Sequence, residues 1–460
     1  MQHENILTHI KNIHLIGIGG VGMSALAMLL KEKGYRVSGS DIREGYYFKK
    51  AESCGINVLT GHRAAHIEGA DIVCYSSAIR PDNPEIVAAR AKGIGVYRRA
   101  EILGMISQGE RVVAVCGSHG KTTTSALLVF LATSLKYKPT AFIGAQPLNY
   151  EKMAWWGNDF FIIEADESDG SFHSYSPWVS ILTNIDNEHL DFYGTREKLD
   201  ENFLEFARHT QELTIGWGDD EAVSGILRQV PSLSYGKDPG NPVRAEGIHY
   251  RGGYTYFDLY IKGRCYPQVC LPLLGEHNVL NTLAVISFFE FIGADIKELI
   301  RVLPEFKSTK RRFQLKSCAE GVIFIDDYAH HPTEIKATLA AARALGSRRL
   351  VVLFQPHRYS RLMRLLNEFA LCFGAADCLI FTDVYAAGEE KPYDFDELAL
   401  GRRLQEGFNG ELHYVAKEKL AGEVSGFIKE GDVVISVGAG DISKITDEVI
   451  SEFTRTRIKA

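Results

Sequence analysis

The sequence predicts an α/β protein with three domains, each built around a mainly parallel β-sheet. Short apolar, β-branched runs alternate with helix-length segments along the chain. Two glycine-rich turns, at residues 17–22 and 117–120, each follow such a run and open a helix. In the last third, polar clusters again follow apolar runs, as ligand-binding residues do at the carboxyl edge of open α/β sheets. The expected domains span residues 1–107, 108–312 and 313–460.

The composition is that of an ordinary globular protein. Of its 460 residues, 45% are hydrophobic and 24% charged, and the net charge of −7 provides no basic surface for bulk nucleic-acid binding. The eight cysteines are scattered without a C-x-x-C pair, which argues against a zinc site or a disulfide framework. The sequence shows neither a signal-peptide pattern nor an apolar run of about 18 residues. We therefore expect a cytoplasmic protein without nucleic-acid or membrane partners, and no pattern indicates its oligomeric state.

The first domain opens with a nucleotide-binding fingerprint. An expected strand, Ile13–Ile18, leads into G-x-G-x-x-G and the helix Met23–Lys33, and a second strand, Arg36–Ser40, ends at Asp41. This pattern predicts a diphosphate at the helix N-terminus beside a ribose, which NAD or a sugar nucleotide would satisfy equally. Glycines that serve only helix–strand packing are the alternative. A third strand, Asp71–Ser76, ends at the same edge, so the candidate binding residues are Gly17, Gly19, Gly20, Val21, Gly22, Asp41, Ser76 and Ser77.

The second glycine-rich turn defines an expected ATP site. Val112–Val115 is typical of a buried parallel strand, and a helix opens at Lys121. The spacing Gly-x-x-Gly-Lys-Thr is shorter than the usual phosphate-binding pattern, so the prediction depends on the strand–loop–helix context. A glycine-rich turn with a chance lysine is the alternative. Lys121 supplies a point charge and the Thr122 hydroxyl can bind Mg²⁺. The candidate residues are Gly117, Ser118, His119, Gly120, Lys121, Thr122 and Thr123.

Two polar loops in the middle third are candidate metal sites. An apolar strand, Phe160–Ile163, precedes four carboxylates within six residues, which would repel one another unless a cation lies between them. Glu164, at the strand tip, is the best candidate ligand for Mg²⁺, and a solvated acidic loop is the alternative. A further strand, Val179–Leu182, is followed by His189 beside carboxylates, either at the metal edge or as a surface histidine.

β-rich material then precedes a helix that starts near residue 274. Asn278 and Asn281 would share one face of this helix, where an asparagine amide can read an adenine edge. Helix capping would explain one asparagine, but not both together with His277. A basic run at 307–312, which includes Arg312, either reaches a γ-phosphate or is a solvated linker.

The last third predicts another doubly wound domain, with strands at Gly321–Ile325, Arg349–Phe354, Cys378–Thr382 and Asp432–Val437. A polar segment, 326–334, follows the first of these strands and opens a helix. Arg358 and Arg361 follow the second strand. Helical spacing i, i+3 would let them clamp a carboxylate or a phosphate.

Together these motifs resemble the Mur ligase family of peptidoglycan and cell-wall synthesis. The resemblance covers essentially the whole chain, and it is specific because eight motifs occur in order. They are GIGGVGMSALA at 17–27, GSHGKTTT at 117–124, EADESDGSF at 164–172, NIDNEHLDFYG at 184–194, GEHNVLN at 275–281, RRF at 311–313, DDYAHHPTE at 326–334 and HRYSR at 357–361.

Within the family, the chain most resembles the ligases that join L-alanine to the carboxylate of UDP-N-acetylmuramate. The resemblance implies ATP as co-substrate, ADP as product, an acyl-phosphate intermediate and two Mg²⁺ ions. It also implies a Rossmann-like N-terminal domain that holds the UDP-sugar rather than NAD. A central P-loop ATPase domain and a Rossmann-like C-terminal domain for the amino acid would follow.

The resemblance assigns roles to the candidate residues. Catalysis would depend on Lys121, Glu164 and His189. One Mg²⁺ would be held by Thr122 and Glu164, and a second by His189. ATP would also contact His277, Asn278, Asn281 and Arg312. Alanine would be held by Tyr328, His330, Arg358 and Arg361.

A departure from the family pattern at residue 203 and three alternative functions qualify this expectation. Phe203 stands where ligases that add later amino acids carry a carbamylated lysine, so the second metal would have a different set of ligands. A recycling ligase that adds a tripeptide to UDP-N-acetylmuramate is the nearest rival, and Arg358 and Arg361 disfavour it. An NAD-dependent oxidoreductase would leave Lys121 and Glu164 without a purpose. A non-catalytic nucleotide sensor is disfavoured because every catalytic position is filled.

Overall fold

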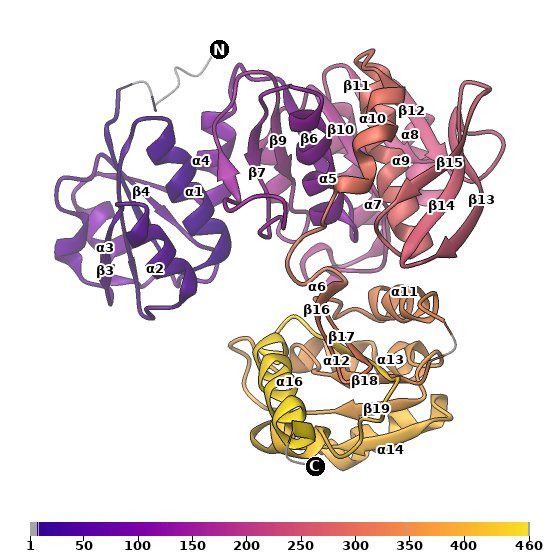
Figure 1. Ribbon diagram of the computed structural model, residues 1–460. Coiled ribbons are helices and arrows are strands. Elements are labelled where there is room, and N and C mark those ends of the chain that lie inside the picture. The colour runs from indigo at the N-terminus through magenta and orange to yellow at the C-terminus, as the bar shows by residue number, and fades with distance from the viewer. Residues whose placement is uncertain (1–6, 8, 347, 459–460) are drawn as a thin grey trace. The chain divides into compact units, whose positions relative to one another are not determined.

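Strands alternate with helices along the chain, and the strands form three β-sheets (Figure 1). The computed structural model describes residue 7, residues 9–346 and residues 348–458. The chain divides into two compact units. One comprises Met1–Glu246, Asp258–Pro267 and Leu280–Lys307, and the other Gly247–Phe257, Gln268–Val279 and Ser308–Ala460. None of the described helices has the length and apolar character needed to cross a membrane. The α/β fold class with mainly parallel sheets, predicted from the sequence, is confirmed.

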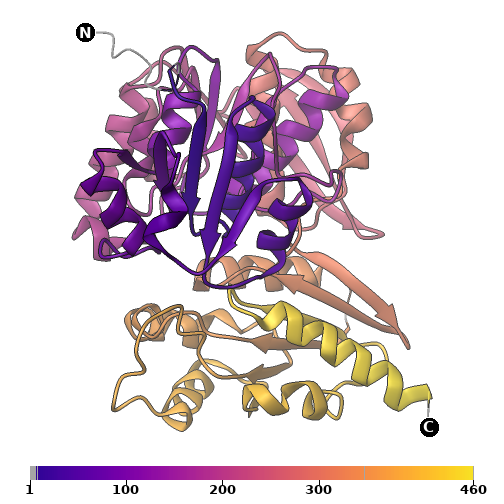
Figure 2. The same cartoon turned by 90° about the vertical axis from the view of Figure 1, so that its left-hand side faces the viewer.

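The N-terminal sheet has five parallel strands in the order β3-β2-β1-β4-β5. Leu15 of β1 packs with helix α1 in one apolar cluster, whereas Ile16 and Val73 pack with α3 in another. The sheet is therefore covered on both faces (Figure 2). Its elements are β1 (Asn12–Ile16), α1 (Val21–Glu32), β2 (Arg36–Asp41), α2 (Tyr46–Ser53), β3 (Asn57–Thr60), η2 (Ala64–Ile67), β4 (Ile72–Tyr75), α3 (Pro84–Ala91), β5 (Gly95–Arg98) and α4 (Arg99–Ile106).

The central sheet has ten strands in the order β15-β14-β13-β12-β11-β10-β6-β9-β7-β8. Strand β6 is buried along its whole length between β10 and β9, and both neighbours run parallel to it. The loops that follow these three strands therefore leave the same edge of the sheet. The strands are β6 (Val112–Cys116), β7 (Thr140–Phe142), β8 (Ala154–Trp155), β9 (Phe161–Glu164), β10 (Val179–Leu182), β11 (Leu213–Trp217), β12 (Ser232–Gly236), β13 (Val243–Arg251), β14 (Tyr254–Ile261) and β15 (Arg264–Leu271).

Helices connect these strands and follow the last of them. Helix α5 begins at the end of the second glycine-rich turn, as the sequence predicts, and all its residues except the first and the last two are buried. The helices are α5 (Lys121–Ser134), η3 (Ser171–Ser174), α6 (Leu190–Tyr193), α7 (Arg196–Arg208), α8 (Glu221–Leu227), α9 (Glu276–Phe291), α10 (Ile296–Val302) and η4 (Leu303–Glu305).

The C-terminal sheet has six strands in the order β16-β17-β21-β18-β19-β20, and only β16 is antiparallel to its neighbour. The sequence does not predict this edge strand, because its alternation of polar and apolar residues is weak. Helix α16 packs against the sheet (Figure 2). The elements are β16 (Gln314–Ala319), β17 (Val322–Asp327), α11 (Pro332–Arg343), β18 (Leu350–Phe354), α12 (Tyr359–Arg364), α13 (Leu366–Cys372), β19 (Cys378–Phe381), α14 (Glu397–Gly407), β20 (Glu411–Tyr414), η5 (Lys417–Lys419), α15 (Leu420–Val424), β21 (Val433–Val437) and α16 (Ile442–Ile458).

A fully buried carboxylate, that of Glu85, ties the N-terminal domain together. Its Oε2 atom lies 3.1 Å from His14 Nε2 and accepts a 2.7 Å hydrogen bond from Ser40 Oγ. Its Oε1 atom accepts from the Arg63 backbone and lies 2.9 Å from His66 Nδ1. Burial would raise the pKa of Glu85, but the hydrogen bonds from His14 and Ser40 lower it to about 2.

Glu85 therefore stabilises the fold above the unfolded-state pKa of about 4.5, and this contribution is lost as the pH falls from there towards about 2. We expect Glu85→Gln to destabilise the domain by about 3 kcal/mol at pH 7 and by much less at pH 3. Hydrogen-exchange protection of the β1 and β2 amides measures this difference. Glu52→Gln, on the exposed side of α2, is the control. An effect of Glu85→Gln that stayed constant with pH would contradict the account.

Candidate functional site

The second glycine-rich turn is held in place by the loop that follows β10. Gly117 and Gly120 have φ angles of 128° and 85°, which favour glycine. The backbone N–H groups of Ser118 and His119 donate to Asn184, at 3.0 Å to its carbonyl and 2.9 Å to its Oδ1. The backbone N–H of Asp186 in turn donates to Ser118 Oγ at 2.8 Å. These bonds fix the turn that presents the first residues of α5.

Lys121, the first residue of α5, forms an ion pair with Glu167. Its Nζ atom lies 2.9 and 2.8 Å from the two carboxylate oxygens and also donates to the Gly117 carbonyl at 2.6 Å. Glu167 is 1% exposed. Burial lowers the pKa of Lys121, but the charges of Glu167 and Asp166 raise it by a larger amount. The pKa therefore lies above its ordinary value. The lysine is thus a permanent cation at the carboxyl edge of the sheet.

Thr122 and Glu164 lie together beside this lysine. Thr122 Oγ1 donates to Glu164 Oε2 at 3.0 Å, and the Gly144 N–H donates to Glu164 Oε1 at 2.6 Å. A hydroxyl and a carboxylate oxygen at hydrogen-bond distance are hard donors of the kind that Mg²⁺ prefers. The two predicted ligands therefore fit a magnesium ion.

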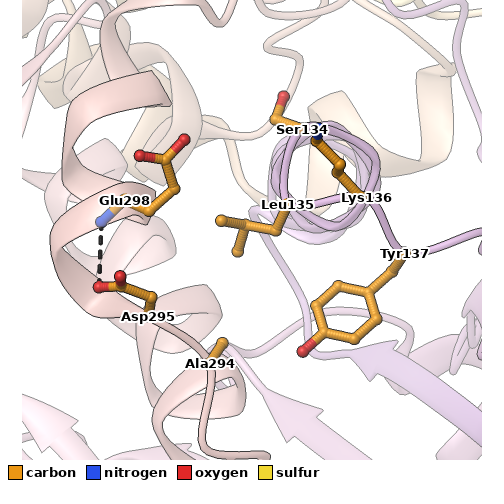
Figure 3. A pocket seen from close by; sticks show the side chains of 7 residues that line it. All are labelled: Ser134, Leu135, Lys136, Tyr137, Ala294, Asp295 and Glu298. Atoms are coloured by element: carbon orange, nitrogen blue, oxygen red, sulfur yellow. Dashed lines mark hydrogen bonds between the residues drawn. The ribbon is translucent and has the colours of Figure 1, made fainter.

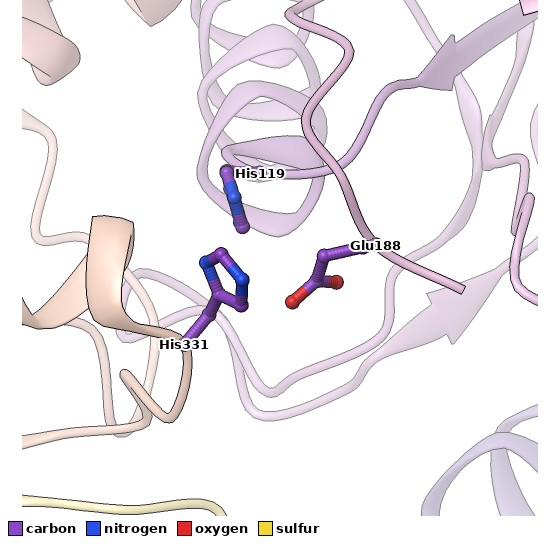
Figure 4. Close-up of side chains that lie close together, drawn as sticks. All are labelled: His119, Glu188 and His331. Carbon is purple, nitrogen blue, oxygen red and sulfur yellow. The ribbon is translucent and has the colours of Figure 1, made fainter. Parts of the chain in front are cut away.

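His189 lies between two carboxylates. Its Nε2 atom is 3.5 Å from Glu167 and 3.3 Å from Glu188. Burial lowers the pKa of His189, but hydrogen bonds to Glu167 and Glu188 raise it to about 9. The imidazole is protonated at neutral pH and has to lose this proton before Nε2 can bind a metal. Glu188 is drawn in Figure 4 together with His119 of the second glycine-rich turn. The His119 Nε2 atom lies 3.1 Å from Asp186 Oδ2.

The structure separates the four carboxylates that the sequence places in one cluster. Glu164 contacts Thr122, Glu167 contacts Lys121, and the side chains of Asp166 and Asp169 accept from nearby backbone N–H groups. Sequence reasoning missed the particular role of Glu167. In the sequence, Glu167 differs from the neighbouring carboxylates only in its distance from the end of the preceding strand.

Phe203, in α7, belongs to the apolar core. It is fully buried, and its ring centroid lies 5.5 Å from that of Phe172. A side chain in this position offers no metal ligand. Any second ion near His189 would therefore depend on the carboxylates around that histidine.

The first glycine-rich turn is held by the end of β2. The N–H groups of Gly17 and Ile18 both donate to the Ser40 carbonyl, and that of Gly19 donates to Asp41 Oδ2 at 2.9 Å. A β-carbon added at Gly17 would lie 3.2 Å from that of Ser76. The predicted residues Gly17, Gly19, Asp41 and Ser76 are thus brought together, while Ser77 is exposed beside them.

Two of the residues predicted to contact adenine lie at the start of α9. The pKa of His277 is lowered to about 4, mainly by burial, so its imidazole is neutral at pH 7. Asn278 is 6% exposed and donates to the Leu274 carbonyl at 2.7 Å, which stabilises the helix start. The third residue, Asn281, lies beside the second glycine-rich turn, residues 117–120. Its Oδ1 atom would be 2.5 Å from a β-carbon added at Gly120.

The C-terminal candidates surround the end of β17 and the start of α11. His330 Nδ1 lies 3.0 Å from the Tyr328 carbonyl, and the His330 N–H donates to Glu334 at 3.0 Å. The Arg312 guanidinium lies 5.1 Å from the Tyr328 ring centroid and 4.0 Å from Glu334. Tyr328, His330 and Arg312 therefore lie together around Glu334, although the resemblance assigns Arg312 to ATP and the other two to alanine.

The prediction that Arg358 and Arg361 lie together on one helix is wrong for Arg358. Arg358 precedes α12 and has a φ of 68°, so it caps the helix rather than continuing it. Arg361 is in the helix, and its Nη1 lies 3.2 Å from His357 Nδ1. Burial, followed by His330, Arg361 and Arg358, lowers the pKa of His357 to about 3. This concentration of cations fits a small carboxylate.

A cavity of about 370 Å³ lies at the opposite end of α5 from the glycine-rich turn (Figure 3). Asp295 caps α10 there by accepting from the Glu298 N–H at 3.2 Å. The cavity contains none of the residues predicted to bind substrates. Its lining is Ser134, Leu135, Lys136, Tyr137, Ala294, Asp295 and Glu298.

We expect Gly120→Ala to weaken ATP binding by roughly tenfold or more, because a side chain there is both strained and in collision with Asn281. Gly109→Ala is a matched control, since Gly109 has a similar φ of 81° but open space around it. Titration calorimetry with ATP measures the difference. Equal ATP affinities of the two variants would contradict the account.

Comparison with known proteins identifies the family of the chain. Three family models match in succession: "Mur ligase family, catalytic domain" over residues 12–111, "Mur ligase middle domain" over 115–289 and "Mur ligase, glutamate ligase domain" over 311–440.

Full-length relatives agree with this assignment. The chain is 40% identical to a UDP-N-acetylmuramate–L-alanine ligase of Anaeromyxobacter sp. over 95% of the chain and 97% of the relative. The corresponding ligase of Gloeobacter violaceus is 37% identical over 95% of each chain. The crystal structure of a UDP-N-acetylmuramate–alanine ligase from Thermotoga maritima superposes with a TM-score of 0.83 at 30% identity, covering 97% of this chain and all of that one. The chain belongs to the Mur ligase family.

Proposed function

We propose that this protein joins L-alanine to the carboxylate of UDP-N-acetylmuramate, with ATP as co-substrate and ADP and phosphate as products. The observation that carries the proposal is the full-length likeness to ligases named for this reaction. The lysine-bearing turn beside Thr122 and Glu164 is consistent with it. We assign the reaction to the cytoplasm, and the three domains to residues 1–107, 108–312 and 313–460.

The reaction proceeds in two steps. The muramate carboxylate attacks the γ-phosphorus of ATP, so that ADP leaves and an acyl phosphate forms. The alanine amine then attacks the acyl carbon, and the tetrahedral intermediate releases phosphate as the amide forms. Lys121 and the N–H groups of the turn stabilise negative charge on the transferred phosphoryl group.

Thr122 and Glu164 would hold one Mg²⁺ in this proposal, and His189 a second once its proton is lost. When bound, magnesium supplies positive charge that offsets the developing charge on the phosphate oxygens. Glu167 keeps Lys121 charged and His189 in position. The candidate ligands of the first ion are oxygen atoms, as this chemistry requires.

The substrate sites follow from the same proposal. The UDP-sugar would occupy the first glycine-rich turn, with its diphosphate at the start of α1 and Asp41 near the ribose. ATP would also contact His277, Asn278, Asn281 and Arg312. The carboxylate of alanine would be held by Arg361 and Arg358, close to Tyr328 and His330.

The recycling ligase that adds a tripeptide is the second candidate. The cationic cluster around His357 favours a small amino acid with a free carboxylate near the site, because a tripeptide carries its charges farther from the reacting amine. An NAD-dependent oxidoreductase would give no role to the ion pair between Lys121 and Glu167.

We expect purified protein to release phosphate from ATP when both UDP-N-acetylmuramate and L-alanine are present, and Lys121→Ala to reduce turnover by at least about 100-fold. Binding of the UDP-sugar to this variant should stay near the wild-type value, because Lys121 lies at the other turn. A coupled phosphate assay and titration calorimetry measure the two quantities.

Lys136→Ala is the control, since Lys136 is exposed beyond the opposite end of the same helix. Phosphate release with tripeptide but not with alanine would refute the proposed substrate. Full activity of Lys121→Ala would refute the role of the lysine.

A further inference from the structure

We propose that Arg99 binds the diphosphate of the sugar nucleotide and is the cationic residue of the first glycine-rich turn. This inference rests on the proposed function, which places a UDP-sugar at that turn. The turn itself, residues 17–22, contains no lysine or arginine. A cationic side chain that meets the diphosphate beside the backbone N–H groups would come from elsewhere in the chain.

Arg99 is the first residue of α4, directly after β5, and it is partly buried. Its guanidinium lies against Gly22, the second residue of α1. A β-carbon added at Gly22 would overlap Arg99 Nη1 and would lie 3.1 Å from Cζ. The space that a side chain would fill at Gly22 is therefore taken by the guanidinium. The glycine is needed for this approach as well as for packing between helix and strand.

The electrostatic setting of Arg99 calls for an anion. Helix α1 has no acidic residue in its first turn and no side-chain cap, so its N-terminus presents positive partial charge. A guanidinium beside such an end is unfavourable unless negative charge lies close to both. Among the described residues, Arg99 forms no hydrogen bond or ion pair with a carboxylate. A diphosphate at the start of α1 would supply negative charge in direct contact with the guanidinium, whereas Asp166 acts on it only at a distance.

The neighbours of Arg99 place it on the substrate side of the domain. Its charge acts on Cys74 near the end of β4, and on Asp166 and Tyr175 in the segment after β9. Arg99 is thus in contact with the first turn of α1 and within electrostatic reach of the acidic segment after β9. The adjacent Arg98 differs, because its side chain is exposed and its interaction with Tyr75 raises its pKa.

The test compares the wild type with Arg99→Ala, Arg99→Gln and Arg98→Ala by calorimetry with UDP, UDP-N-acetylglucosamine and UDP-N-acetylmuramate. We expect both Arg99 variants to bind all three ligands about 10- to 100-fold more weakly, as for the loss of a charge-assisted hydrogen bond. Uridine, followed by ligand-observed NMR, should bind with unchanged affinity. Arg98→Ala removes the same charge from the next position and should change UDP affinity by less than about threefold.

Each other outcome overturns the inference. Unchanged UDP affinity would show that Arg99 does not meet the diphosphate. A loss confined to UDP-N-acetylmuramate would assign Arg99 to the muramate carboxylate, and an equal loss for uridine would indicate a general disturbance of the domain. Arg99→Gln keeps most of the side-chain volume, so it carries the test if Arg99→Ala does not fold. Failure of the wild type to bind any UDP ligand would instead refute the proposed function.

Discussion

The ion pair between Lys121 and Glu167 is the interaction on which the candidate site depends. A buried lysine would lose its charge without a partner, and a buried carboxylate would be equally costly if left alone. The same carboxylate also contacts His189, so one side chain after β9 orders residues from the loops after β6 and β10. Three parallel neighbouring strands make this possible, because their carboxyl ends meet at one edge of the sheet.

In the N-terminal domain, too, a glycine-rich turn is held by groups that are distant in the sequence, and we propose that this turn holds the UDP-sugar. Its glycine-rich turn is fixed by the end of β2, where Ser40 accepts two backbone hydrogen bonds and Asp41 accepts a third. Glu85 anchors Ser40 from the interior, and Arg99 faces the turn from α4. The turn is thus in contact with, or anchored through, side chains that lie up to about 80 residues away in the chain.

Sequence patterns predicted what is local. The strand–turn–helix around Lys121, the acidic strand tip at Glu164 and the fingerprint at residues 17–22 are each encoded in a short continuous segment of the chain. Glu167, Arg99 and Glu85 could not be singled out, because their roles depend on which distant groups they meet. Arg358 was misplaced for a different reason: helical spacing does not show where a helix begins, and the positive φ of Arg358 sets that point.

The formation of an acyl phosphate is the central claim, and an isotope measurement tests it most directly. UDP-N-acetylmuramate labelled with ¹⁸O in both carboxylate oxygens would be turned over with ATP and L-alanine, and the released phosphate analysed by mass spectrometry. Attack of the carboxylate on the γ-phosphorus places one labelled oxygen in each phosphate and leaves the other in the amide. Phosphate without label would contradict the account.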